Sequence, residues 1–175
     1  MESTIASPAR VSSAPEKGVD SRPLFRLAIA TVLGIGYVPV APGTFGSAVG
    51  LLLWMALGAS GSSATVQGAV IVALFVVGSI AGNAAEHHFG RTDPRQVIID
   101  EVMGTLITLF LNPVHWKGAL AGFLLFRATD VLKPYPANRL ERLPGGVGVM
   151  ADDAMAAIYA NIALRALLAF GHRVI

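Results

Sequence analysis

Long apolar stretches separated by short polar or proline-rich segments run through most of this chain. Residues 64–85 contain no charged side chain and reach the roughly 20 residues that a helix needs to cross a bilayer. A last helix is expected to be capped by Asp152 or Asp153 and to end near Phe170. Shorter apolar helices are expected at four places, residues 24–35, 47–57, 97–111 and 118–132. The pattern predicts an all-α, compact membrane protein with several short or broken apolar helices.

The first 23 residues differ from the rest of the chain. They are rich in Ser, Ala and Pro and show no periodicity, which is typical of a disordered tail. We expect no signal peptide, because the first apolar run begins only after this long polar stretch. Residues 24–175 are then expected to form a single helical membrane domain.

Composition supports the membrane assignment, with 54% hydrophobic and 14% charged residues and a mean hydropathy of +0.63. The net charge of +2 gives no reason to expect nucleic acid as a partner. The chain has no cysteine, which excludes a thiolate nucleophile and a disulfide framework. Basic residues between 127 and 142 predict that this region lies on the cytoplasmic side of the membrane.

Five of the eleven acidic residues lie inside otherwise apolar segments. Removing a carboxylate from water costs several kcal/mol unless a cation or a hydrogen-bond network compensates. Five acidic residues in apolar segments therefore indicate that these carboxylates have a function. We therefore expect a metal site built from three segments of the chain. Its candidate ligands are Asp100, Glu101, Asp130, Asp152 and Asp153.

Each acidic segment also has a simpler explanation. Asp100 and Glu101 lie in the first turn of their helix, where acids complement the helix dipole. Asp152 and Asp153 precede an apolar helix, and one of them could cap it. Capping needs only one acid, however, and two adjacent acids repel each other unless a cation lies beside them.

A third segment combines both signs of charge. Arg127, Asp130 and Lys133 recur at three-residue intervals and share one helix face. An ion pair between Arg127 and Asp130 would explain two of them. Lys133 directly precedes Pro134, at a helix end from which its ammonium group can reach a ligand, and cations beside a carboxylate suit a metal-bound phosphate. Both explanations remain open.

Four motifs in order closely resemble the bacterial phosphatidylglycerophosphatase A family. They are GIGYVPVAPGTFGS (34–47), IDEVMG (99–104), FRATDVLKPYP (126–136) and LERLPGGVGVMADDAMAAIYA (140–160). The resemblance implies a mostly helical enzyme of the bacterial cytoplasmic membrane. Such an enzyme removes the terminal phosphate of phosphatidylglycerophosphate to give phosphatidylglycerol, with Mg²⁺ as cofactor, in phospholipid biosynthesis.

The resemblance also implies which residues form the site. Asp100 and Glu101 match the family's DE pair, Asp130 and Lys133 match its FRxxDxxKPxP segment, and Asp152 and Asp153 match its DD pair. Ala157 stands where the family usually has glycine in DDxxAG. We expect this difference to affect packing and to leave the ligands unchanged.

The residue types suit phosphomonoester hydrolysis. Its transition state carries charge on the equatorial oxygens, which Mg²⁺, Lys and Arg stabilise, while carboxylates hold the metal and orient the attacking water. We expect the five acids to bind Mg²⁺, and Glu101, Lys133 and Asp153 to act in catalysis. Four residues are expected to bind the phosphate or head group, namely Arg127, Lys133, Thr44 and Ser47.

Two other classes of function remain as alternatives. An ion-coupled membrane transporter would use intramembrane carboxylates as a cation or proton path, and it predicts acids distributed along a transmembrane route. A non-catalytic membrane scaffold would pair each acid with a neighbouring arginine. The enzyme reading instead predicts one polar site at the membrane interface.

Overall fold

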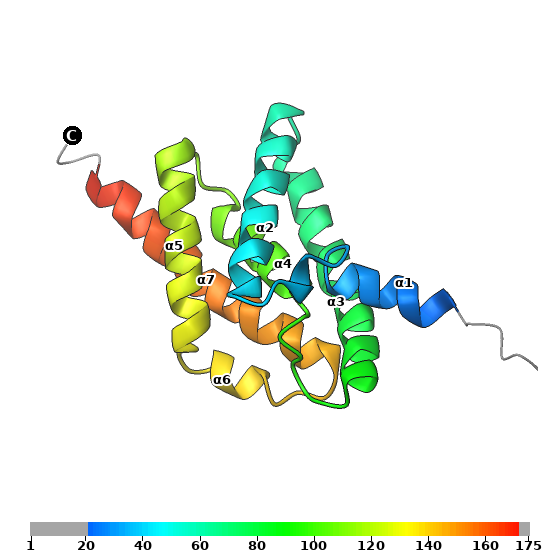
Figure 1. Cartoon of the computed structure of the whole chain (residues 1–175). Helices are drawn as coiled ribbons and strands as arrows, with labels where there is room; N and C mark the ends of the chain where they lie inside the picture. The colour runs from blue at the N-terminus through cyan, green and yellow to red at the C-terminus, as the bar shows by residue number, and fades with distance from the viewer. Residues whose placement is uncertain (1–20, 172–175) are drawn as a thin grey trace, which may run out of the picture.

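The computed structural model describes residues 21–171, where the ordered elements are helices, as Figure 1 shows. This confirms the all-α prediction. Residues 1–20 of the tail predicted for residues 1–23 lie outside the described residues. The elements are α1 (Ser21–Ala30), the 3₁₀ helix η1 (Ile35–Tyr37), α2 (Pro42–Ala59), α3 (Ala64–Phe89), α4 (Ile99–Leu109), α5 (Trp116–Leu132), α6 (Ala137–Leu140) and α7 (Gly146–Gly171).

Three helices, α2, α3 and α7, are long and apolar enough to cross a membrane. The span predicted at residues 64–85 is confirmed, and α3 continues to Phe89. The start predicted for the second helix, at Ser47, is wrong because α2 begins at Pro42. Proline has the φ angle of a helix and needs no helical hydrogen-bond donor in the first turn, so it starts this helix instead of interrupting the segment.

The predicted start of the last helix is also wrong. α7 begins at Gly146, so Asp152 and Asp153 lie inside the helix and do not cap it. The glycines before them allow close contact between helices. The Cα atom of Gly146 lies 3.1 Å from the position that a Cβ atom on Gly82 of α3 would occupy. α7 can therefore begin directly against α3.

The short helix α4 forms the centre of the fold. It contacts α2, α3, α5 and α7, which surround it in Figure 1. Nine of its eleven residues are buried. Glycines allow the neighbours to approach, since Gly104 of α4 packs against the Phe126 ring of α5 and Gly46 of α2 packs against Ile98. The first turn of α4 is thereby enclosed by protein.

Ala157 lies at one of these helix contacts, as expected from its place in the sequence. It is fully buried in a cluster with Phe126, Ala156 and Ala160. Its backbone oxygen lies 3.4 Å from the hydroxyl group of Thr108, which donates to it. The methyl group therefore fills a packed helix interface.

The close contact of α3 with α7 predicts a specific instability. A Cβ atom added at Gly146 would collide with the Ser79 carbonyl oxygen and lie 2.6 Å from the Asn83 backbone nitrogen. Gly146→Ala should therefore lower the free energy of unfolding in detergent micelles by about 1–3 kcal/mol. Gly58→Ala is the matched control, because a Cβ atom there meets no atom within 4 Å. Equal stability of the two variants would contradict this packing.

Candidate metal centre

A pocket of about 260 Å³ gathers the chemically active side chains at one end of the helical bundle. It is formed by the start of α2, the loop between α3 and α4, the first turn of α4, the end of α5 and the first turns of α7. All five carboxylates expected from the sequence are among its lining residues, with Lys133. The residues that line it are Pro42, Gly43, Asp93, Arg95, Val97, Asp100, Glu101, Asp130, Val131, Lys133, Asp152 and Asp153.

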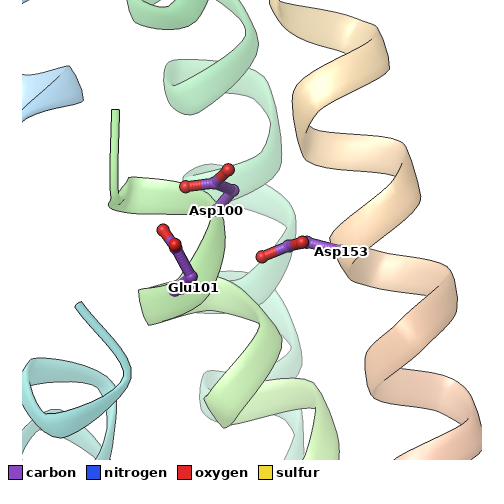
Figure 2. Close-up of side chains that lie close together, drawn as sticks. All are labelled: Asp100, Glu101 and Asp153. Carbon is purple, nitrogen blue, oxygen red and sulfur yellow. The ribbon is translucent and has the colours of Figure 1, made fainter. Parts of the chain in front are cut away.

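Three of these acids form a compact cluster. Asp100 and Glu101 from α4 and Asp153 from α7 each offer a carboxylate oxygen, and these oxygens lie within 4.8 Å of one another (Figure 2). Asp100 is 5% exposed and Asp153 is 4% exposed. Each acid also has a buried oxygen without a hydrogen-bond partner, namely Asp100 Oδ1, Glu101 Oε2 and Asp153 Oδ2. Buried oxygens of this kind fit a hard metal cation.

The pKa values of the acids at the first turn of α4, a helix too short to cross a membrane, reflect how closely these carboxylates are packed. Burial raises the pKa of Asp100 well above its usual range, and the neighbouring Glu101 charge raises it further. Burial is also the main reason why the pKa of Glu101 rises to about 8. A cation among these oxygens would relieve both effects, because it favours the charged forms.

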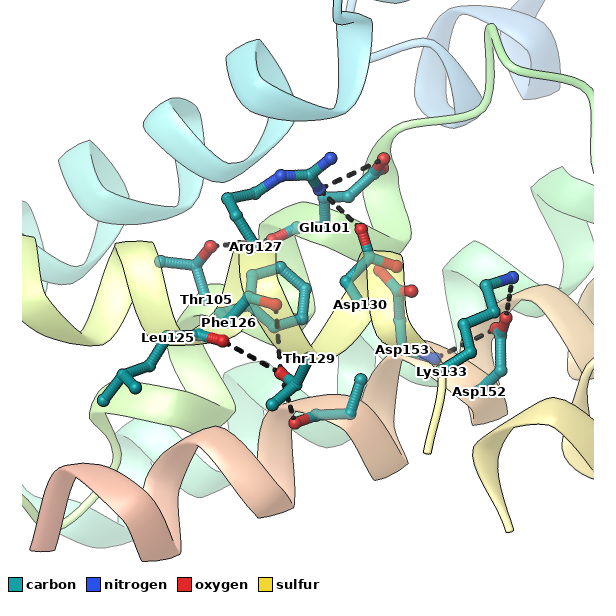
Figure 3. A network of polar contacts seen from close by, with 11 residues as sticks. Glu101, Thr105, Leu125, Phe126, Arg127, Thr129, Asp130, Lys133, Asp152 and Asp153 are labelled. Carbon is teal, nitrogen blue, oxygen red and sulfur yellow. Dashed lines mark hydrogen bonds and ion pairs between the residues drawn. The ribbon is translucent and has the colours of Figure 1, made fainter. Parts of the chain in front are cut away.

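Arg127 of α5 faces this cluster. Its Nη1 atom lies 2.8 Å from Asp130 Oδ2 and 3.8 Å from Glu101 Oε1, as Figure 3 shows. The ion pair of Arg127 with Asp130 that the spacing allowed is thus present. The guanidinium group also links the acids of α5 and α4. Asp130 lines the pocket, but its carboxylate is directed toward Arg127.

Lys133 holds the other side of the pocket. Its Nζ atom donates to Asp152 Oδ2 at 2.7 Å and lies 3.3 Å from Glu141 Oε2. Burial lowers the pKa of Lys133, but the hydrogen bond to Asp152 and the negative charges of Asp152, Asp93 and Glu141 together outweigh this effect and raise the pKa above its usual value. The other Asp152 oxygen, Oδ1, accepts the backbone N–H of Asp153 at 2.9 Å. Both oxygens of Asp152 therefore have hydrogen-bond partners within the protein, and the ammonium group of Lys133 is charged.

The two α2 residues expected to bind the head group lie elsewhere. Thr44 is exposed and Ser47 is fully buried, and neither lines the pocket. Gly43, which the sequence analysis did not select, does line it. A side chain at Gly43 would collide with Glu101 Oε1 and would lie 3.0 Å from two guanidinium nitrogens of Arg127. Glycine thus lets α2 begin this close to the charged groups as they are placed here.

Sequence reasoning also missed Asp93 and Arg95 in the loop between α3 and α4. Asp93 is half-buried with a φ of 44°, and its backbone N–H donates to Glu86 Oε1 at 3.1 Å. Few non-glycine residues in proteins have a φ angle in this region. Those that do are often found at functional sites. Burial raises the pKa of Asp93, and the charge of Lys133 lowers it. Charged residues on both sides of Pro94, just before a buried apolar segment, are the signal that could have identified this loop.

Comparison with known proteins relates this pocket to a protein family. The sequence model of a family described as Phosphatidylglycerophosphatase A matches residues 28–168, which include every residue of the pocket. A Haemophilus influenzae protein named Phosphatidylglycerophosphatase A is 35% identical over 146 residues, 79% of this chain and 86% of its own length. An Escherichia coli protein of the same name is 31% identical over 132 residues, which are 74% of this chain and 76% of the length of that protein.

A third relative carries a different name. A Bacteroides thetaiotaomicron protein, provisionally named a phosphatidylinositol-3-phosphatase, is 37% identical over 141 residues, 77% of this chain and 87% of its own length. No solved structure matches the chain. All three names describe enzymes that remove a phosphate from a phospholipid head group.

The geometry of the cluster predicts which acids a divalent cation needs. Asp153→Asn keeps the shape of the side chain but removes its charge, so it should weaken the binding of a divalent cation, tested with Mg²⁺, at least about tenfold. Isothermal titration calorimetry of the purified protein in detergent measures this affinity. Glu141→Gln is the control, because Glu141 contacts Lys133 at the pocket edge and lies outside the three-acid cluster. Equal losses in both variants would contradict a specific site.

Proposed function

Because the chain belongs to the phosphatidylglycerophosphatase A family, we propose that it hydrolyses the terminal phosphomonoester of phosphatidylglycerophosphate to phosphatidylglycerol and phosphate. One observation of the structure carries this proposal. A pocket at one end of the membrane helices brings carboxylates with unpartnered oxygens together with the cationic side chain of Lys133, and Arg127, which does not itself line the pocket, is paired with two of the carboxylates that do. A phosphorylated lipid head group is the ligand class that uses both features.

Mg²⁺ is the proposed cation. Asp100, Glu101 and Asp153 offer only oxygen donors, which hard cations prefer, and Mg²⁺ keeps several waters, so three protein ligands suffice. When bound, Mg²⁺ would neutralise charge on the phosphoryl oxygens. Asp130 and Asp152 stay predicted ligands, although each is bonded to a basic side chain.

Lys133 is well placed to bind the phosphate. An ammonium group has three N–H donors. Asp152 accepts one of them and Glu141 Oε2 lies 3.3 Å from Nζ, so at least one donor remains for a phosphate oxygen. The same two acids hold the side chain in position. Arg127 is fixed in the same way by Asp130 and Glu101, which leaves guanidinium N–H groups for a second oxygen. Both cations thus face the charge that develops during phosphoryl transfer.

Glu101 is the proposed base. One of its oxygens faces Arg127, and the other is buried without a partner in the acidic cluster. Glu101 can bind the cation through one carboxylate oxygen and, through the other, accept a proton from water as the oxygen of that water bonds to phosphorus. The proton then passes to the glycerol oxygen as its bond to phosphorus breaks. Asp153 would orient the water from the other side of the cluster.

The position of the acids favours an enzyme over a transporter. Every acidic side chain in residues 21–171 either lines the pocket or contacts a residue that does. The acids therefore gather at one end of the bundle and do not mark a route across it. We also propose that this end faces the cytoplasm, because Arg127, Lys133, Arg139 and Arg142 lie in the same region.

Activity and substrate choice can be tested together. Lys133→Met keeps the length of the side chain without its charge, so it should lower kcat on phosphatidylglycerophosphate about 10²–10³-fold. Phosphate release from mixed micelles measures this. Lys117→Met is the matched control, because Lys117 lies at the other end of α5, over the Trp116 ring. It should keep full activity.

The same assay compares three lipids, namely phosphatidylglycerophosphate, phosphatidic acid and phosphatidylinositol 3-phosphate. We expect the highest kcat/KM with the first. Higher activity on the phosphoinositide would move the assignment toward the Bacteroides relative. Absence of phosphate release from all three lipids with Mg²⁺ present would contradict the proposed function. Retained Mg²⁺ affinity of Lys133→Met shows that the variant is folded.

A further inference from the structure

Both charged and apolar residues line the candidate pocket. The loop between α3 and α4 contributes Asp93 and the exposed side chain of Arg95. Arg95 forms no ion pair with any residue that the structure describes. The pocket is also lined by two apolar residues at helix ends, Pro42 at the start of α2 and Val131 near the end of α5. A ligand in this pocket therefore meets both charged and apolar surroundings.

Val131 belongs both to the pocket and to the outer surface of the protein. It lines the pocket and is nevertheless 75% exposed. The next residue, Leu132, is 76% exposed. In the sequence, these two residues stand between Asp130 and Lys133, which are both charged residues of the site. Single exposed apolar residues are ordinary on protein surfaces, but here the apolar surface begins directly at a charged pocket.

The apolar surface continues along α5 and α2. Leu124 and Leu120 of α5 are exposed and precede Val131 by seven and eleven residues, so the three side chains lie on one helix face. On α2, exposed Phe45 lies one turn after Pro42, and exposed Val40 lies just before the helix. Such surface is more stable against lipid chains than against water.

We propose, on the basis of the function proposed above, that the lipid substrate enters the pocket sideways from the bilayer, between the start of α2 and the end of α5. The phosphorylated head group lies in the pocket. The acyl chains of the diacylglycerol part lie along the α5 face that Val131, Leu124 and Leu120 form. The loop with Asp93 and Arg95 faces the aqueous side.

The energetics of lipid transfer favour this route. Moving an acyl chain from the bilayer into water costs about 0.8 kcal/mol for each CH₂ group. A substrate that entered across the loop with Arg95 would have to expose part of its chains to water. A substrate that enters over Val131 keeps its chains in contact with apolar surface while its phosphate reaches Lys133. The charged and apolar residues of the pocket thus orient the lipid as well as admitting it.

The test compares two substrates that differ only in their chains. One is long-chain phosphatidylglycerophosphate in vesicles, and the other is its water-soluble dibutanoyl analogue. Val131→Asn removes the apolar contact without adding charge near the acids. It should lower kcat/KM about tenfold for the vesicle substrate, the effect of losing one buried valine contact, and less than about twofold for the soluble analogue.

Val147→Asn is the matched control. Val147 is 44% exposed in the first turn of α7, at the same end of the molecule, and does not line the pocket. It should leave both substrates unaffected. An equal loss of Val131→Asn on both substrates would show a general disturbance of the site and overturn the proposal, as would no loss on either. A wild-type protein inactive on both substrates would contradict the proposed function itself.

Discussion

A carboxylate buried among apolar helices needs a positive charge close to it, and this constraint organises the whole molecule. Asp100 and Glu101 lie in the first turn of α4, a helix with nine buried residues out of eleven. α7 brings Asp153 to the same point. The desolvation of three such groups costs several kcal/mol for each ion unless it is compensated. The surrounding helices supply Arg127 and Lys133, and the remaining unpartnered oxygens leave a place for a metal ion.

The structure separates the acids into two groups that look alike in the sequence. Asp130 and Asp152 each bond to a basic side chain at a distance below 3 Å, and both hold that base in position. Asp100, Glu101 and Asp153 keep oxygens without a protein partner. The first group therefore orients the cations that would bind phosphate, and the second group suits a metal. The acids that hold the phosphate-binding cations and the acids that suit the metal ion are therefore different residues of one pocket.

Much of the fold was predictable because helix length and apolar content are local properties. The α3 span and the helices that contain Asp100 and Asp130 were found in this way. The starts of α2 and α7 were not. Pro42 and Gly146 are residues that usually interrupt helices. Pro42 is tolerated because it occupies the first turn of α2, and the contact with α3 shows why α7 can begin at Gly146. Local rules cannot include a partner that is distant in the sequence.

The site was predictable to a similar extent, and for a related reason. Acids in apolar segments stand out, so all five were expected to meet, and they line one pocket. Gly43, Asp93 and Arg95 carry no such signal, because glycine and charged residues are ordinary in loops and at helix ends. Only the tertiary arrangement shows that Gly43 must be small to admit Glu101 and Arg127. Thr44 and Ser47, chosen from the same motif, lie outside the pocket.

The claim at the centre of this account is that three carboxylates from α4 and α7 share a divalent cation. Anomalous X-ray diffraction from crystals of the protein grown with Mn²⁺, which prefers the same oxygen ligands as Mg²⁺, locates that cation directly. The account predicts a peak bonded by oxygens of Asp100, Glu101 and Asp153. No peak there, with these three carboxylates each bonded to a basic side chain, would contradict it.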